Sequence, residues 1–270
     1  MKAGEGIMAL PQGLNDFALA DKAALVIGAE HPAGRVAAAT LAEAGARLMI
    51  ASQEPGTDEQ IRETVKAVQA AGANKAAPIT QVQNAAIRAD VRSTIDTAVK
   101  RLSGLDVMVT ALDAPYYAPA EEGDDAIFDR VMERNVKNVW MACQEGARAM
   151  HRRGGSIVVI SSVLAERGVP GASLYCAAKG AVANLVRALA LEWARQNIRI
   201  NLLEAGWMNE EGSPALANDE FAANLLKYLP YKRLVRPEEL AGALLYLASP
   251  ASGFVTGEAI AIDGGLLCRV

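Results

Sequence analysis

Short apolar runs alternate with stretches of helical periodicity along almost the whole chain. The runs are apolar at nearly every position, which is typical of strands that are buried on both faces. When helices separate such strands, the strands build a parallel sheet that helices cover on both sides. The sequence therefore predicts the α/β class, with a single-domain, doubly wound parallel sheet. The predicted strands are residues 23–27, 47–51, 106–110, 156–160, 198–202 and 258–262.

No linker, low-complexity tract or internal repeat divides the chain, so we predict one domain over residues 1–270, with 1–20 as an N-terminal extension. Residues 75–88 are longer than a simple connection requires and leave room for a strand and a surface excursion. Residues 207–231 follow the carboxyl end of a strand, where ligands of open α/β sheets bind, and are predicted to form a substrate lid. An ordinary surface loop with a short helix is the alternative. The predicted helices are residues 36–44, 61–71, 128–150, 174–196 and 238–248.

Composition limits the partners of the chain. Hydrophobic residues make up 51% of the 270 residues, so we expect a substantial buried core. The net charge of −4 and the pI near 5.4 argue against a nucleic acid or an anionic membrane as partner. No apolar run approaches the roughly 20 residues of a membrane span, and the N-terminal stretch lacks the pattern of a secretory signal. We therefore expect a soluble, cytoplasmic protein.

Histidine and cysteine are few. Cys143, Cys176 and Cys268 cannot all pair with one another, and they show no metal-ligand spacing. His31 and His151 are far apart, and the chain has no Gly-x-Ser-x-Gly, His-Glu-x-x-His or Walker lysine motif. Histidine-based hydrolysis and zinc chemistry are therefore not expected, and we predict no metal site.

Tyr175 and Lys179 are four residues apart, which places both side chains on one face of a predicted helix. A phenol is a poor acid or base near neutral pH, because its ordinary pKa is about 10. A neighbouring ammonium favours the phenolate and lowers that pKa. The pair is a way to build a proton-transfer group without histidine, although such a spacing also arises by chance.

Other motifs in the same order resemble the short-chain dehydrogenase/reductase family over about residues 20–265. Tyr175 and Lys179 match its Tyr-x-x-x-Lys signature, Ser162 lies thirteen residues upstream at a strand end, and Asn135 matches the fourth member of the family's catalytic set. The C-terminal landmarks are residues 237–241, 255–258 and 263–265. The resemblance implies a Rossmann-like fold.

The resemblance also implies a role for each of the four residues. Tyr175 donates a proton to a carbonyl oxygen as hydride arrives, or removes it in oxidation, and Ser162 hydrogen-bonds that oxygen. Lys179 lowers the tyrosine pKa and holds the nicotinamide ribose hydroxyls, and Asn135 supports a water chain to Lys179. Cys176, beside the tyrosine, is predicted to be a small packing residue and not a nucleophile.

The cofactor motifs match the family less well. Gly28 and Gly34 match its glycine-rich turn, but Ile27 replaces a threonine and Pro32 the middle glycine. Proline suits the first turn of a helix, so the turn itself can survive. Residues 110–113 replace the usual Asn-Asn-Ala-Gly, and Ala205-Gly206 replaces Pro-Gly. The resemblance implies cofactor contacts at Gly28, His31, Pro32, Ala33, Gly34, Ser52, Asp90, Val91, Ala111, Tyr175, Lys179 and Gly206.

The end of the second predicted strand bears on which dinucleotide binds. It lacks the Asp or Glu that holds the ribose hydroxyls of NAD, and Ser52 would accommodate a 2′-phosphate instead. His31 stands where NADP-preferring relatives often carry Arg or Lys, whereas the nearby Glu54 leaves NAD open. Asp90 matches the aspartate that faces the adenine. The sequence slightly favours NADP(H).

We therefore predict an NAD(P)(H)-dependent oxidoreductase that interconverts a ketone and a secondary alcohol. Two alternatives stay open: a lyase or isomerase that reuses the tyrosine without redox chemistry, and a non-catalytic binding protein of the same fold. The substrate pocket is predicted from residues 113–117, 163–165 and 206–208, with the lid. The residues Tyr116, Tyr117, Trp207 and Met208 favour an apolar or ring-containing small molecule.

By the resemblance, the long helices over residues 125–150 and 174–196 pair in homodimers or homotetramers. Trp140, Val186 and Leu189 are candidates for that interface, and burial within one chain would explain them equally well.

Overall fold

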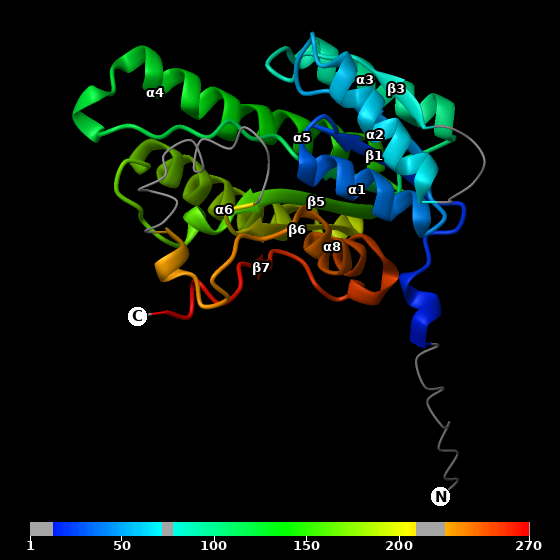
Figure 1. The fold of residues 1–270 in the computed structure, drawn as a ribbon. Helices are drawn as coiled ribbons and strands as arrows, with labels where there is room; N and C mark the ends of the chain where they lie inside the picture. Colours follow the sequence, from blue (N-terminus) through cyan, green and yellow to red (C-terminus); the bar gives the residue numbers. More distant parts are fainter. Residues whose placement is uncertain (1–12, 72–77, 209–224, 270) are drawn as a thin grey trace, which may run out of the picture.

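Seven parallel strands form one sheet in the order β3-β2-β1-β4-β5-β6-β7, as the computed structural model of the chain shows (Figure 1). The structure describes residues 13–71, 78–208 and 225–269. All six strand pairs are parallel. The strands are β1 Ala23–Ile27, β2 Arg47–Ala51, β3 Ile79–Gln81, β4 Val107–Thr110, β5 Gly155–Ser162, β6 Ile198–Ala205 and β7 Ala259–Ile262.

Helices cover both faces of this sheet. One layer holds α1 (Pro32–Glu43), α2 (Asp58–Ala70) and α8 (Ala241–Ala248), and the other holds α3 (Arg88–Leu102), α5 (Asn138–Met150) and α6 (Ser173–Trp193). Helix α4 (Asp125–Met132) precedes α5 (Figure 1). The short helical turns are η1 Gly13–Phe17, η2 Ala120–Glu122, η4 Val163–Ala165, η5 Ala194–Gln196, η7 Pro237–Leu240 and η8 Pro250–Ser252, and a π-helical turn, η3, spans Glu133–Lys137.

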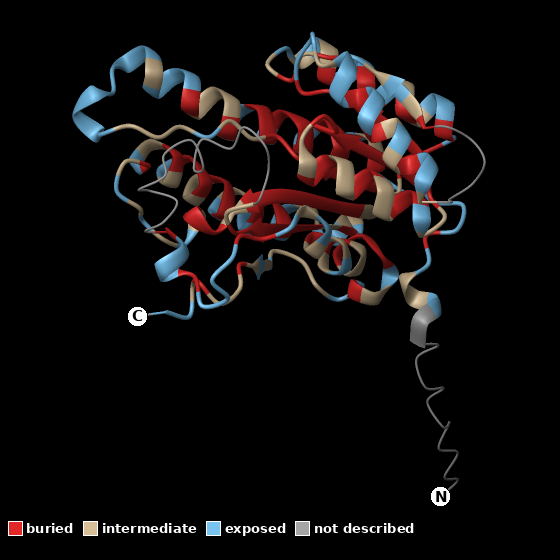
Figure 2. Ribbon diagram, viewed as in Figure 1, coloured by how far each residue is buried: buried red, intermediate tan, exposed pale blue. Residues whose placement is uncertain are grey.

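Successive side chains of the central strands enter two separate cores. In β1, Leu25 and Ile27 pack under α3, α5 and α6, whereas Val26 packs under α1 and α8. All three are fully buried, and Figure 2 shows the strands and the inner helix faces buried together. Burial of one such side chain stabilises the fold by about 1.5–3 kcal/mol. The doubly wound sheet that the apolar runs predicted is therefore confirmed.

The main differences from the expected elements lie in and around α3. This helix was not expected, because its buried Val91, Ile95 and Leu102 are separated by Arg, Asp and Lys, which dilute the apolar pattern. Strand β3 confirms that residues 75–88 hold a strand. Residues 72–77, and residues 209–224 of the predicted lid, lie outside the described part of the chain.

The single long helix expected over residues 128–150 is instead three segments. Helix α4 begins earlier than expected, because Asp124 caps it by accepting a hydrogen bond from the Ile127 N–H at 2.8 Å. The π-helical turn η3 then separates α4 from α5 and contains Asn135. Such turns insert one extra residue into a helix and are frequent at functional sites.

Helix α6 with its following turn, Ser173–Gln196, is long and apolar enough to cross a bilayer by length and composition, with a mean hydropathy of 1.3 in its most apolar window. The sequence had led us to expect no such segment. The helix packs against β6, and its buried Val182, Ala183 and Val186 belong to the core under one face of the sheet. The core helix of a soluble protein has the same composition, and we assign α6 to the core.

Glu145 of α5 is a buried carboxylate that three arginines hold. Its oxygens accept hydrogen bonds from Arg92 at 2.9 and 3.0 Å, from Arg148 at 2.8 Å and from Arg88 at 3.1 Å. The hydrogen bonds from Arg92, more than the others, lower the pKa of Glu145 to about 2. The cluster ties α3 to α5.

Glu145 should therefore make the fold acid-sensitive. Because its pKa is lower in the folded than in the unfolded chain, its stabilisation, up to about 3 kcal/mol, is complete above about pH 5 and is lost as the pH falls toward 2. Urea unfolding should show that Glu145→Gln destabilises the protein at pH 7 and much less at pH 3. Glu59→Gln, at an exposed site on α2, is the control. An equal effect of Glu145→Gln at both pH values would contradict this assignment.

Candidate active site

Helix α6 brings Tyr175 and Lys179 to the carboxyl ends of the central strands. Both are buried, and the Lys179 Nζ lies 5.2 Å from the centre of the Tyr175 ring, so they share one face as predicted. Ser162 is the last residue of β5, and its Oγ accepts a hydrogen bond from the Leu164 N–H at 3.2 Å. Sequence spacing therefore placed Tyr175 and Lys179 together, and Ser162 lies at the strand end where it was expected.

Asp113, three residues beyond the end of β4, is the unexpected member of this group. Its Oδ1 accepts a hydrogen bond from the Tyr175 hydroxyl at 2.7 Å and lies 2.7 Å from the Lys179 Nζ in an ion pair. The sequence marked Asp113 only as a departure from Asn-Asn-Ala-Gly and as a pocket residue. Its place after a central strand, at the edge where Tyr175 was expected, was the available signal.

Asp113 reverses the predicted effect on the tyrosine. Burial, and then the charge and hydrogen bonding of Asp113, raise the pKa of Tyr175 well above its ordinary value, while a hydrogen bond with Ser162 acts the other way. The prediction that Lys179 lowers the pKa of Tyr175 is therefore wrong for the protein without a bound cofactor, because the ammonium is paired with Asp113. Burial is the largest single effect on the pKa of Asp113 and raises it, but the charge and hydrogen bonding of Lys179, together with the hydrogen bond from Tyr175, leave that pKa below its ordinary value.

Two buried amide side chains hold the segment that carries Asp113. Gln53 accepts a hydrogen bond from the Asp113 N–H at 3.0 Å and donates to its carbonyl oxygen at 3.4 Å. Asn135 does the same for Ala114, at 3.1 and 2.8 Å. The position of Asp113 is therefore built into the loop, and the sequence had not indicated the role of Gln53.

Asn135 also donates to the Val131 carbonyl oxygen at 3.0 Å. An amide side chain has two donors and two acceptor lone pairs. Three of these four are used by main-chain groups, so one lone pair of Oδ1 remains for a water molecule. The water chain from Asn135 to Lys179 stays a prediction.

The glycine-rich turn has the shape that a dinucleotide pyrophosphate requires. Gly28 has φ +84°, and a Cβ there would overlap the carbonyl oxygen of Ala111. A Cβ on Gly34 would overlap the carbonyl oxygen of Gly28. Pro32 is the first residue of α1, where its missing N–H costs nothing. The turn therefore survives the loss of its middle glycine and still presents a helix N-terminus to an anion.

The other predicted cofactor residues follow different strands along the carboxyl edge of the sheet. His31 is the N-cap of α1, and Ala33 is buried in its first turn. Asp90, in the first turn of α3, accepts a hydrogen bond from the Asn84 N–H at 3.3 Å, and Val91 is buried beside it. Gly206 follows β6 and donates to the Ile262 carbonyl oxygen at 3.0 Å.

The end of β2 differs from expectation. Ser52 is fully buried, and its hydroxyl bonds the main chain of Gln83, so in this arrangement it does not face a 2′-phosphate. Glu30, from the glycine-rich turn, instead accepts a hydrogen bond from the Gln53 N–H at 2.6 Å, and its Oε2 has no hydrogen-bond partner among the described residues. Burial raises the pKa of Glu30, against the charge of His31. The Glu30 carboxylate therefore lies at the end of β2, although the end of this strand itself carries no Asp or Glu. Glu54 forms an ion pair with Arg134.

A small pocket of about 60 Å³ opens beside the Tyr175 hydroxyl. Tyr117, Trp207 and Met208 line it, as the sequence predicted, and the Tyr117 ring centre lies 6.1 Å from that of Tyr175. Tyr116 and residues 163–165, which were predicted to line the pocket, are not among its lining residues, and the side chains of 163–165 pack in apolar clusters instead. The complete lining is Asp113, Pro115, Tyr117, Ser161, Ser162, Tyr175, Ala205, Gly206, Trp207 and Met208.

Comparison with known proteins identifies the family. Residues 28–267 match the family model described as enoyl-(acyl carrier protein) reductase. A rabbit protein named dehydrogenase/reductase SDR family member 4 is 31% identical, over 93% of this chain and 96% of its own. The chain belongs to the short-chain dehydrogenase/reductase family. The resemblance drawn from Tyr175, Lys179, Ser162 and Asn135 is therefore confirmed.

Two further relatives of this short-chain dehydrogenase/reductase carry activity names. A gluconate 5-dehydrogenase of Gluconobacter oxydans is 34% identical, over 93% of this chain and 96% of its own. The crystal structure of a gluconate 5-dehydrogenase from Burkholderia cenocepacia in complex with NADP and tartrate superposes with a TM-score of 0.86 at 32% identity, covering 95% of this chain and 99% of that one. The chain is thus an NAD(P)-dependent oxidoreductase of this family.

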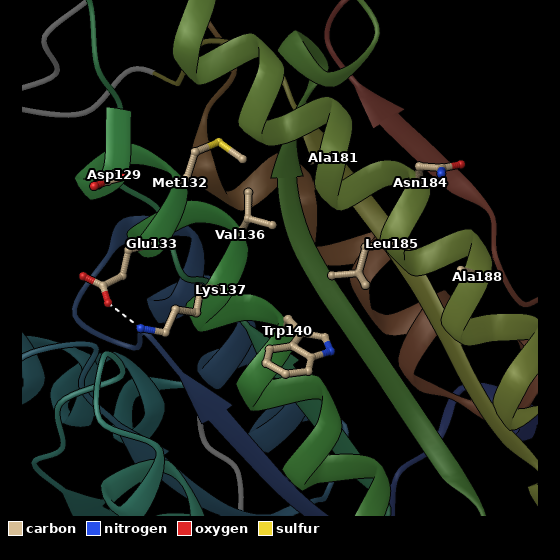
Figure 3. Close-up of a pocket in the computed structure, with 10 residues that line it drawn as sticks. All are labelled: Asp129, Met132, Glu133, Val136, Lys137, Trp140, Ala181, Asn184, Leu185 and Ala188. Atoms are coloured by element: carbon tan, nitrogen blue, oxygen red, sulfur yellow. Dashed lines mark hydrogen bonds and ion pairs between the residues drawn. The ribbon is translucent and has the colours of Figure 1, made fainter. Parts of the chain in front are cut away.

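A larger groove of about 960 Å³ lies away from the tyrosine, between the η3–α5 segment and α6 (Figure 3). Met132, Val136 and Trp140 line one side and Leu185 the other. Trp140 is partly exposed there, as an interface residue would be. Val186 and Leu189 are buried in the core, so of the two readings left open for them, burial within one chain is the one that the structure supports.

Proposed function

We propose that this enzyme interconverts a ketone and a secondary alcohol, with Tyr175 as the general acid and base. The observation that carries the proposal is that Tyr175 and Ser162 line one small pocket, with the Lys179 ammonium 5.2 Å from the centre of the Tyr175 ring. A carbonyl oxygen in that pocket would lie within reach of the phenol, which is the geometry that general acid catalysis requires.

Three side chains have separate roles in the proposed reaction. When bound, the nicotinamide supplies or accepts the hydride at the carbonyl carbon. In reduction, Tyr175 gives its phenolic proton to the substrate oxygen, and Ser162 donates a hydrogen bond that stabilises the charge developing there. Lys179 stabilises the phenolate that remains, once its ammonium is released from Asp113. Oxidation runs through the same atoms in reverse.

For the cofactor we propose NAD(P)(H), with NADP(H) slightly preferred. The glycine-rich turn and the N-terminus of α1 would hold the pyrophosphate, and Lys179 the nicotinamide ribose. His31 beside the turn and the NADP complex of the Burkholderia relative support NADP(H). Glu30 opposes it, because a carboxylate beside Gln53 repels a 2′-phosphate. We therefore expect dissociation constants of NADPH and NADH within about tenfold of each other.

Glu30→Gln should shift this balance further toward NADPH. Removing one negative charge beside the 2′-phosphate should tighten NADPH binding roughly three- to tenfold relative to NADH binding. This change corresponds to a difference of about 1 kcal/mol in binding free energy. Fluorescence titration of both reduced cofactors at pH 8 measures the ratio. Glu43→Gln, at the exposed far end of α1, should leave the ratio unchanged. An unchanged ratio in Glu30→Gln would remove Glu30 from the adenosine site.

For the substrate we propose an apolar or ring-containing ketone or alcohol. Tyr117, Trp207 and Met208 supply apolar walls at the tyrosine. Sugar acids, after which the gluconate 5-dehydrogenase relatives are named, are the competing class. Turnover of cyclic ketones and of keto sugar acids, compared by kcat/KM, separates the two classes.

Cofactor binding tests the proposed function directly. NADPH and NADH are titrated into the protein and nicotinamide fluorescence is followed, before substrates are screened. Binding of at least one below millimolar concentration, together with turnover of a carbonyl compound, is the expected result. Failure of both to bind at millimolar concentration would refute a redox function.

We also propose that two or four copies assemble through the groove of Figure 3, in the cytoplasm. Trp140 lies partly exposed over this apolar groove, which a second copy would cover. Light scattering after size-exclusion chromatography should give the molar mass of a dimer or tetramer. The Trp140→Glu substitution should lower the measured mass toward that of the monomer. A wild-type monomer at micromolar concentration would contradict this assembly.

A further inference from the structure

Asp113 takes up both of the hydrogen-bond donors that the proposed reaction needs. A single oxygen, Oδ1, lies 2.7 Å from the Tyr175 hydroxyl and 2.7 Å from the Lys179 Nζ. Lys179 is almost completely buried, so few other acceptors can reach its ammonium. In this state neither donor is directed at a substrate or a cofactor.

The contact is built into the fold. The main chain on either side of the Asp113 carbonyl carbon is held by Gln53, two residues beyond β2, and by Asn135 in the π-helical turn. The side chain itself is 38% exposed, so rotation about its own bonds can carry the carboxylate toward solvent without moving the loop. Asp113 therefore has a main chain that is held in place and a carboxylate that can rotate.

The same two donors are the ones that a nicotinamide ribose would need. Under the proposed function, on which this inference rests, Lys179 holds the ribose hydroxyls beside Tyr175. The Lys179 ammonium has three N–H donors, but the same Asp113 oxygen that it contacts also holds the Tyr175 hydroxyl, so a ribose hydroxyl beside this tyrosine would compete with a charged acceptor, which is the stronger one. The negative charge of Asp113 also cancels the positive charge that Lys179 offers to an anionic dinucleotide.

We propose that Asp113 sets the affinity for the nicotinamide half of the dinucleotide, because its carboxylate must leave Lys179 before the nicotinamide ribose can bind. In the protein without cofactor, Asp113 contacts both Tyr175 and Lys179, and cofactor binding displaces its carboxylate from them. The adenosine half binds at the glycine-rich turn and the end of β2, and its affinity does not depend on Asp113.

Binding of whole and half cofactors tests this inference. Asp113→Ala should tighten NADPH or NADH binding about 10- to 100-fold, the range that corresponds to losing one charge-assisted competitor. Asp113→Asn, which keeps the shape but not the charge, should give an intermediate gain. Adenosine 2′,5′-diphosphate and ADP lack the nicotinamide ribose, and their dissociation constants should stay within about twofold. Asp96→Asn, which removes the same charge at the surface of α3, should change neither.

The outcomes separate this inference from the proposed function. If wild type binds a dinucleotide and both Asp113 variants bind it equally or more weakly, Asp113 does not compete and the inference is overturned. If the half cofactors tighten as much as the whole ones, the effect is not local and the inference is also overturned. If neither wild type nor any variant binds a dinucleotide, the proposed function fails and the inference with it. Thermal unfolding of Asp113→Asn verifies that the compared proteins are folded.

Discussion

Tyr175→Phe is expected to lower kcat about a thousandfold or more while changing the NADPH dissociation constant by less than about threefold. Removal of a positioned proton donor typically costs 10²- to 10⁴-fold in rate. The lost hydroxyl is bonded to Asp113, and Asp113 keeps its ion pair with Lys179, so the variant should fold normally. Steady-state kinetics in both directions, with fluorescence titration of the cofactor, measures the two effects separately.

Tyr246→Phe is the matched control, because Tyr246 lies on α8, among the residues that pack against the opposite core. It should retain wild-type kcat. Turnover that survives in Tyr175→Phe would refute the assigned proton donor. An equal loss in both variants would show that the tyrosine change acts through the fold.

Gly34→Ala is expected to destabilise the protein by at least about 2–3 kcal/mol and to abolish cofactor binding. The added Cβ would overlap the carbonyl oxygen of Gly28 and approach the carbonyl carbon to 2.9 Å, and these are backbone atoms that cannot rotate away. The glycine-rich turn would have to move away from α1, and overpacking of this kind costs about 1–3 kcal/mol or more. The melting temperature should fall by roughly 5–10 °C in a chain of this size.

Gly242→Ala provides the comparison, since a Cβ there meets nothing within 4 Å on the exposed side of α8. Alanine favours a helix over glycine by up to about 1 kcal/mol, so this variant should be as stable as wild type or slightly more stable. Differential scanning fluorimetry with and without NADPH reads stability and binding together. A Gly34→Ala protein that keeps both would mean that the turn is not as close to α1 as the structure shows.

The local pattern of apolar residues explains why much of the fold could be predicted from the sequence. The limits of β1 and β2 agree with their predicted runs residue for residue, because β1 is buried at every position and β2 at every position after Arg47. Helix α3 was missed because its exposed face carries many charges. The π-helical turn at Asn135 was missed because the periodicity on either side continues with only one residue inserted.

For the candidate site, the sequence by itself paired Tyr175 with Lys179, since one-turn spacing follows from the chain alone, and the family resemblance added Ser162 and Asn135 as predictions. The tertiary structure decided what those groups touch. The Asp113–Tyr175 contact joins residues 62 positions apart, and the Glu30–Gln53 contact residues 23 apart. Loop conformation and sheet order set such distances, and neither is encoded in local periodicity. The sequence thus placed Tyr175 beside Lys179, and the loop after β4, which Gln53 and Asn135 hold, placed a carboxylate against both.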